Sequence, residues 1–376
     1  MTALPHPVDH LVIGGGLAGS MVAIRLAAAG RGVVLLEKER SSHHKVCGEF
    51  LSTEAVDYLR SAGVNPLDLG AAPIHSVRLS SRQTVVEAPL PFAALSLSRS
   101  VLDAAMLARA AQSGCIVRLG APVESLEKRG DLWRVQLRNG ESLSARTVFL
   151  ANGKHDLRGW ERGPGIQGDL VGFKLHWRLQ PHQTEALREH IELFLFPGGY
   201  GGLSLVESDL ANLCLVVHRA SLRSLGGWTE LLAAILADNQ HLRLRLHGAN
   251  PLWDRPLAIS AIPYGYLANG ASSLWRVGDQ AAAIPSFTGD GMSIALHSGV
   301  LAAQMFLAGA TADQFHQKLH TQLSRAMILA TLLSRAMVTG PGRTLAPLCL
   351  SLFPHAMRWI AASTRISSQH LLAKSA

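Results

Sequence analysis

The sequence predicts an α/β fold with a Rossmann-type dinucleotide-binding domain, an inserted antiparallel β-sheet substrate domain and C-terminal helices. Three observations predict it. A strand, a glycine-rich turn, a helix and a second strand follow one another within residues 8–39, strand-like runs fill about residues 166–265, and a basic segment ends the chain. With 376 residues and 48% hydrophobic composition, the chain can bury large cores in two intertwined domains.

The first segment predicts a phosphate-binding helix start. Residues 10–39 read HLVIGGGLAGSMVAIRLAAAGRGVVLLEKE, in which Gly14, Gly16 and Gly19 form a G-x-G-x-x-G pattern between an apolar strand and a helix. The first glycine permits the tight turn, the second lets a pyrophosphate approach the backbone, and the third lets helix and strand pack closely. The free N–H groups and the positive dipole of the helix start attract the phosphates.

The second strand, GVVLLE, ends on Glu37, whose carboxylate is expected to bind both hydroxyls of an adenosine ribose. Ala18 at the helix start and Lys38 after the strand complete the contacts expected in this unit. The G-x-G-x-x-G pattern alone is weak evidence, whereas the whole strand, turn, helix, strand and acid series is strong.

A second glycine-rich segment identifies the dinucleotide. Residues 274–304, LWRVGDQAAAIPSFTGDGMSIALHSGVLAAQ, place a strand before Gly278 and a turn before a long uncharged helix. This segment resembles the second FAD motif of the flavoprotein monooxygenase and geranylgeranyl reductase superfamily, which includes flavoproteins similar to p-hydroxybenzoate hydroxylase. The resemblance covers about residues 8–310 and implies FAD, with Asp279 on the ribityl chain. The resemblance also implies that the turn and the start of the following helix lie beside the flavin, where Gly289, Asp290 and Gly291 would contact it.

Two further segments support the same family. SLSRSVLDAAMLARAAQSGCIV resembles its R-xxx-D-xxx-L segment, which implies that Arg99 lies along the ribityl and pyrophosphate groups and that Asp103 starts the following helix. CIVRLG and the next three apolar runs predict a β-meander with a tight turn at Asn139–Gly140. At its end Gly153 is expected to contact FAD. Asn152 stands where aromatic hydroxylases of the family have Asp, so NADPH or NADH is only a candidate electron donor.

Residues 41–55, SSHHKVCGEFLSTEA, resemble the K-x-CG stretch of geranylgeranyl reductases. The resemblance implies that Cys47 and Gly48 line the flavin. A thiol there is the candidate catalytic group, because it can donate a proton or tune the redox chemistry. The alternative is a small buried cysteine with a packing role only.

The middle of the chain supplies the candidate substrate residues. In LVGFKLHWRL, Lys174, His176 and Arg178 alternate with apolar residues and share one face of a strand. That face either binds a phosphate, carboxylate or phenolate, or is a solvated outer face. FPGGYGG resembles a segment over the substrate cavity of the reductase branch, which makes Tyr200 a candidate cavity residue.

These segments divide the chain into three parts. We expect a discontinuous FAD-binding domain at 1–75, 95–165 and 266–313, a substrate domain at 76–94 and 166–265, and a basic helical tail at 314–376.

The tail is basic because the last acid of the chain is Asp313. Seven of the 35 Lys and Arg residues follow it, so residues 1–313 carry a formal charge of only +1. Its alternation of Arg with Leu, Met and Ile predicts a helix whose basic face meets an anionic membrane, meets an acidic partner such as an acyl carrier protein, or is merely solvated. The uncharged stretch 291–312 is expected to be a buried helix and not a membrane span.

Composition excludes several other classes. The four cysteines form no C-x-x-C pair, so we expect neither a disulfide framework nor a metal site. The N-terminal residues do not form a secretion signal, which predicts a cytoplasmic protein, with membrane association through the tail as an option. Aromatic residues are not interleaved with the basic run, so no nucleic-acid partner is expected.

The resulting prediction is an FAD-dependent oxidoreductase. The leading hypothesis is a monooxygenase acting on an apolar aromatic, polyketide or isoprenoid-like substrate, free or bound to a carrier protein. The alternative is a flavin-dependent C=C reductase or dehydrogenase of the geranylgeranyl reductase type. A third hypothesis is a flavin-binding docking protein that has lost its activity.

Overall fold

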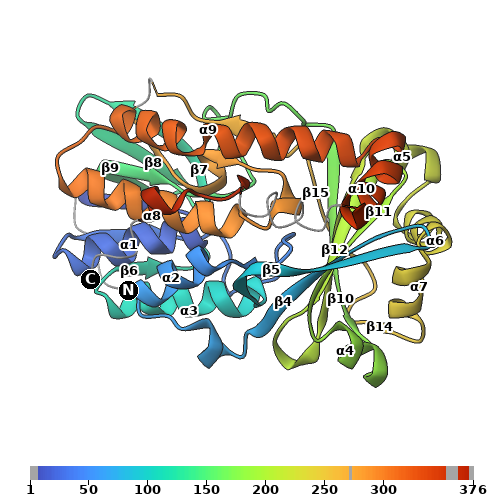
Figure 1. Ribbon diagram of the computed structural model, residues 1–376. Helices are drawn as coiled ribbons and strands as arrows, with labels where there is room; N and C mark the ends of the chain where they lie inside the picture. Colours follow the sequence, from blue (N-terminus) through green and yellow to red (C-terminus); the bar gives the residue numbers. More distant parts are fainter. Residues whose placement is uncertain (1–6, 271–272, 353–362, 372–376) are drawn as a thin grey trace.

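Two β-sheets lie side by side, and the long helix α9 (Ala312–Met337) extends over both (Figure 1). The computed structural model describes residues 7–270, 273–352 and 363–371. The predicted mixed α/β architecture is confirmed. The tail residues Arg358 and Lys374 lie outside the described residues.

The first sheet is the dinucleotide-binding unit, and its central strands are parallel. Helices pack on one face, where Val12 and Leu35 are buried, and the alternate residues Leu11 and Val34 are buried on the other face. Burial on both faces explains why these strands read as continuous apolar runs. In spatial order the strands are β6 (Ile116–Arg118), β2 (Val33–Leu36), β1 (Val8–Ile13) and β9 (Ser142–Leu150), followed on the far side of β9 by β17 (Trp275–Arg276), β8 (Leu132–Leu137) and β7 (Val123–Arg129).

One strand of the predicted meander lies elsewhere. CIVRLG forms β6, which pairs in parallel with β2 at the edge of the sheet. Helix α3 (Arg99–Gln112) precedes β6 and carries the chain back across the sheet, and such a crossover produces a parallel strand. The antiparallel meander contains only β7, β8 and β9, with the predicted turn at Asn139–Gly140 between the last two.

The helices of this unit are packed against one another under the first sheet. Helix α8 (Gly291–Leu307) has 11 of its 17 residues buried, which confirms a buried helix in the uncharged stretch 291–312, although the helix ends at Leu307. Among the described segments, every helix falls short of the length and apolar character that crossing a bilayer requires. Besides α3, the helices here are α1 (Leu17–Ala28), α2 (Thr53–Ser61) and α8 (Gly291–Leu307).

The second sheet is antiparallel except where β11 pairs with β4. Its outer face packs on α6 (Trp228–Asp238) and α7 (Gln240–Leu246). Its strands begin at Phe50, earlier than the predicted substrate domain, because β3 pairs with β5. In spatial order the strands are β14 (Asn250–Pro251), β10 (Leu170–Arg178), β13 (Ala211–His218), β12 (Gly199–Leu205), β11 (Glu189–Phe196), β4 (Ala72–Ser81), β5 (Thr84–Ser96) and β3 (Phe50–Leu51), with β15 (Leu257–Ser260) also on β10.

The remaining elements are short and connect these layers. They are α4 (Pro181–Leu187), α5 (Arg219–Leu225), α6 (Trp228–Asp238), α7 (Gln240–Leu246), α10 (Gly340–Leu352), the pair β16 (Tyr266–Leu267) and β18 (Ala282–Ala283), and the 3-10 helices Pro66–Leu69, Glu207–Asp209, Gly278–Gln280, Ser286–Thr288 and Ser368–His370.

Candidate functional site

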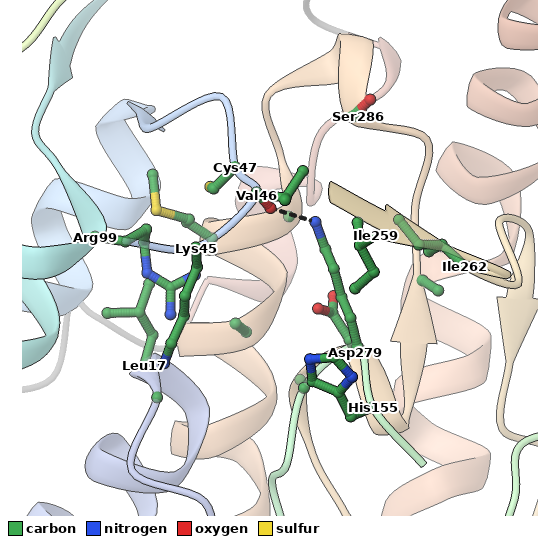
Figure 2. Close-up of a pocket in the computed structure, with 18 of the residues that line it drawn as sticks. Leu17, Lys45, Val46, Cys47, Arg99, His155, Ile259, Ile262, Asp279 and Ser286 are labelled. Carbon is green, nitrogen blue, oxygen red and sulfur yellow. Dashed lines mark hydrogen bonds between the residues drawn. The ribbon is translucent and has the colours of Figure 1, made fainter. Parts of the chain in front are cut away.

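A cavity of about 680 Å³ lies between the two sheets. Figure 2 shows Leu17, Lys45 and Arg99 on one side of it and His155 and Asp279 on the other. Its walls combine segments that lie far apart in the sequence, from Ile13 to Ala295. The predicted residues that line it are Gly14, Gly16, Ala18, Glu37, Lys38, Cys47, Gly48, Arg99, Gly153, Tyr200, Asp279, Gly289 and Gly291.

The first glycine turn exposes the start of α1 to this cavity. Gly16 is the N-cap of α1, and no side chain among the described residues caps the helix. A Cβ built on Gly14, at φ +109°, would lie 2.4 Å from the Ala151 carbonyl oxygen, and one on Gly19 would lie 2.0 Å from the Gly14 oxygen. Both positions therefore require glycine, because the backbone packs too closely there for a side chain. Gly19 itself does not line the cavity.

Gly16 has a different environment. A Cβ built there would point toward cavity-lining side chains and meet no atom nearer than Arg99 Nη2 at 3.5 Å. Beside it, the Gly15 N–H donates to Glu37 Oε2 at 2.7 Å, so one oxygen of the predicted ribose ligand is fixed by the turn. The space beside Gly16 is therefore open and lies at an uncapped helix start, which is the arrangement that accepts a diphosphate.

Two cations lie beside the start of α1. Arg99 and Lys45 both contact the buried Asp103 carboxylate, at 2.9 Å and 2.8 Å. Burial opposes ionisation of Asp103, but the charges of Arg99 and Lys45 outweigh it and lower the pKa of Asp103. Two positive charges against one negative charge leave a net positive charge for phosphate. Asp103 is the fifth residue of α3, because Ser98 caps that helix, so the expectation that Asp103 starts the helix is wrong.

The start of α8 lies at the other end of the cavity and also has no side-chain cap. Gly289 and Gly291 line the cavity, whereas the Asp290 side chain is buried beneath it, with Oδ1 3.7 Å from Arg365 Nε. The two uncapped helix starts and the fixed carboxylate of Glu37 fit FAD. Glu37 would hold the ribose and Gly16 the diphosphate, with the flavin toward Cys47, Gly48 and Gly291.

Asp290 is expected to make stability depend on pH. Burial raises the pKa of Asp290 to about 7, although the charge of Arg365 opposes the shift. Between about pH 4 and pH 7 the folded protein therefore retains a proton that the unfolded chain has released, and the free energy of unfolding falls as pH rises. In urea-unfolding measurements across this pH range, Asp290→Asn is expected to reduce by about one the number of protons released on unfolding, and so to flatten the pH dependence of the unfolding free energy. An unchanged slope, equal to that of the exposed-turn control Asp131→Asn, would contradict this.

The basic face of β10 is neither solvated nor part of the cavity lining. Lys174 and His176 are fully buried, and both contact the buried carboxylate of Glu49. His176 Nε2 is 2.8 Å from Glu49 Oε2, and the backbone N–H of Arg99 donates to Glu49 Oε1 at 2.7 Å. This corrects the assignment of Lys174 and His176 as substrate residues, since Glu49 already occupies the face that was expected to bind an anion. Only Arg178, at the strand end, is exposed.

Glu49 is the residue that sequence reasoning missed. Burial opposes its ionisation, but the hydrogen bond with His176 and the charge of Lys174 outweigh it, so the pKa of Glu49 lies below its usual value. Its backbone is left-handed, at φ +58°, a conformation that a non-glycine residue retains only when surrounding contacts hold it. Its N–H donates to Cys47 Sγ at 3.4 Å. Glu49 therefore fixes the Cys47–Gly48 loop at the cavity.

The same cluster contains three potential metal ligands. His44, Glu49 and His176 bring ligand atoms within 4.8 Å of one another. The Lys174 ammonium already bonds the Glu49 carboxylate, and its charge opposes a metal cation at that place. We therefore assign this cluster to positioning and not to metal binding.

The part of the cavity under the second sheet is largely apolar, although the Lys154 ammonium lies beside it and donates to the Val46 carbonyl oxygen at 2.7 Å. Tyr200 lies there as predicted, with its hydroxyl 3.2 Å from Ser334 Oγ. Burial raises the pKa of Tyr200, and it raises the pKa of Cys214 to about 12, so both groups stay neutral near pH 7. The neighbouring wall is aliphatic and aromatic. It is formed by Leu193, Leu215, Val216, Ile259, Ile262 and Phe287.

Comparison with known proteins agrees with this geometry. Residues 7–153 match the family described as FAD binding domain. Menaquinone reductase of Mycolicibacterium smegmatis is 27% identical over 89% of this chain and 87% of its own length. Digeranylgeranylglycerophospholipid reductase 2 of Methanopyrus kandleri is 25% identical over 79% of this chain and 76% of its own.

A relative with another chemistry matches a smaller part of the sequence, whereas the fold is shared more widely. The FAD-dependent monooxygenase OpS4 of Beauveria bassiana is 32% identical over 35% of this chain and 34% of its own length. Among solved structures, the myxobacterial chondrochloren halogenase shares the fold, with a TM-score of 0.76 and 18% identity over 98% of this chain and 95% of its own. The protein is an FAD-dependent oxidoreductase, and its relatives are named as menaquinone and geranylgeranyl lipid reductases and as an FAD-dependent monooxygenase.

Proposed function

We propose that this protein is a flavin-dependent reductase of carbon–carbon double bonds in an apolar, isoprenoid-like chain. One observation carries the proposal: the Cys47 thiol lines the cavity between the glycine turns that fit FAD and the largely apolar wall under the second sheet. The relatives named as reductases match 79% and 89% of the chain, against 35% for the monooxygenase. This support favours the reductase hypothesis over the monooxygenase that the sequence favoured.

The cavity wall suits a long hydrocarbon substrate. Its neutral tyrosines, neutral Cys214 and aliphatic residues carry no charge, and the nearby Lys154 ammonium already donates to the Val46 carbonyl oxygen. An apolar chain gains free energy by leaving water for such a wall. The role of this wall is to bind the chain, hold one double bond near Cys47 and exclude water.

Reduction of a double bond requires a hydride on one carbon and a proton on the other. When bound and reduced, FAD supplies the hydride and becomes oxidised. Cys47 donates the proton: its S–H bond breaks, a C–H bond forms at the second carbon, and the sulfur keeps the electron pair. The Glu49 N–H already points at this sulfur and stabilises the negative charge on it. A proton from solvent restores the thiol before the next cycle.

NADPH or NADH is the proposed source of the electrons. Anaerobic mixing of the oxidised holoenzyme with each nucleotide is expected to bleach the flavin absorbance within the time of turnover. Bleaching by neither nucleotide would assign reduction to another donor. A flavin that no donor reduces would instead support the docking-protein hypothesis.

A single turnover without oxygen tests the proposed reaction. Photoreduced holoenzyme mixed anaerobically with a geranylgeranyl lipid is expected to give a product that has gained two hydrogens, together with oxidised flavin. Product that forms only in air and has gained an oxygen atom would establish the monooxygenase instead.

Cys47→Ser is expected to slow this turnover, because positioned proton donors contribute about 10²–10⁴-fold to rate. Flavin reduction by the nucleotide should keep its rate, since the thiol acts only on the substrate. Cys115→Ala is the matched control, because Cys115 is also unpaired but does not line the cavity. Equal turnover in both variants would remove Cys47 from the proposed step.

A further inference from the structure

We propose that the outer face of α9 docks the protein on an anionic membrane surface, from which the apolar substrate enters the cavity. The docking itself follows from the surface of the helix. The account of substrate delivery rests on the proposed function.

The docking face is a stripe along the second half of α9, formed by Arg325, Ile328, Leu332 and Arg335 and named here the α9 stripe. Their spacing of three, four and three residues places them on one side of the helix. Ile328 is 57% exposed and Leu332 60%, although both are large aliphatic residues. Leu345, 53% exposed, adds a third on the adjoining helix α10.

Among the described residues, no acidic side chain pairs with the arginines of the stripe. No acid follows Asp313 in the chain. Arg343 pairs with Asp238 and Arg365 with Glu54, whereas in the part of the chain that the structure describes Arg325 and Arg335 form no ion pair. Basic residues that flank exposed aliphatic ones are the composition of a helix lying in a membrane interface. Anionic headgroups pair with the arginines, and the acyl boundary accepts the aliphatic side chains.

The inner face of the same helical turns lies against the cavity wall. The Ser334 hydroxyl contacts that of Tyr200 at 3.2 Å, and Val338, the C-cap of α9, packs in one cluster with Ile262 and Tyr264. All three partners line the cavity. A bilayer on the α9 stripe would therefore lie about one helix diameter, roughly 10 Å, from the substrate wall. This proximity favours a membrane over an acidic soluble protein as the partner.

Vesicle flotation with the holoenzyme tests the docking. The protein is expected to float with vesicles of phosphatidylcholine and phosphatidylglycerol, and much less with phosphatidylcholine alone. Arg325→Gln/Arg335→Gln should weaken binding about 25-fold, since each basic residue near an anionic surface contributes about fivefold. Ile328→Ser/Leu332→Ser should weaken it at least about tenfold. Leu67→Ser, which removes an aliphatic residue 49% exposed in the Pro66–Leu69 turn, should bind as the parent does.

A second measurement separates this inference from the proposed function. Turnover of a detergent-dissolved substrate should be equal in the parent and in all three variants, because none of the changed residues lines the cavity. Absence of flotation, or equal flotation of the stripe variants and the parent, would overturn the docking proposal even if turnover persists. Binding of an acidic carrier protein through these residues, with no vesicle binding, would also overturn it. Flotation without any double-bond reduction would leave docking standing and refute the reductase.

Discussion

Gly16→Val is expected to give a folded protein that has lost most of its affinity for FAD. Gly16 has φ −75°, which valine adopts without strain, and its built Cβ meets no protein atom nearer than 3.5 Å. The added side chain therefore occupies only the space into which the phosphates would approach. Overfilling a packed contact costs about 1–3 kcal/mol, which corresponds to about 5- to 150-fold in affinity.

Fluorescence titration of the apoprotein with FAD measures this loss, and thermal unfolding of the apoprotein measures its fold. Gly168→Val is the matched control, because its built Cβ also has open space and Gly168 does not line the cavity. FAD binding by Gly16→Val at the affinity of the control would show that the diphosphate does not lie on this turn.

Glu49→Gln is expected to lower the free energy of unfolding by about 3–5 kcal/mol, as removal of one partner from a buried ion pair usually does. Lys174 and His176 are both fully buried, and Glu49 is the anion that both contact. Glutamine keeps the size of the side chain and an oxygen for the Arg99 N–H, so the loss reports the missing negative charge.

The double variant Glu49→Gln/Lys174→Met tests the cause, because it also removes the unpaired positive charge. It is expected to recover much of the loss in denaturant-unfolding measurements. Glu185→Gln provides a surface control, since Glu185 is 73% exposed in its pair with Arg188 and should cost less than about 1 kcal/mol. If Glu49→Gln is no less stable than Glu185→Gln, the buried cluster does not hold the loop.

Local patterns made the cofactor end of the site predictable. The roles of Gly14 and Gly19 follow from backbone spacing, and a strand that ends on Glu37 places that carboxylate next to the turn. These relations join residues that are close in the sequence or linked by a single βαβ unit, so the sequence states them directly.

The Glu49 cluster could not be predicted in the same way. Alternation along β10 showed that Lys174 and His176 share a face, but it did not show what covers that face. The answer is a carboxylate more than 120 residues away in sequence, on a left-handed residue of a loop. The only local signal was an acid directly after the Cys47–Gly48 pair.

The tail was predicted only in part. The helix and its basic side were predictable from composition, and the exposed Arg325 and Arg335 agree with it. Arg365 behaves differently: its side chain is 7% exposed, contacts Glu54 and lies over the Phe92 ring. A count of charges in the tail does not distinguish an arginine that folds back onto the core from one that faces outward.

The central claim is that one cavity binds both halves of FAD, the adenosine half and the flavin half. Calorimetric titration of the apoprotein with FAD and with FMN tests it most directly, because FMN lacks the adenosine half that Glu37 and the start of α1 would hold. We expect one FAD per chain, bound at least about 100-fold more tightly than FMN. Equal affinity for the two flavins, or no uptake of FAD, would contradict the account.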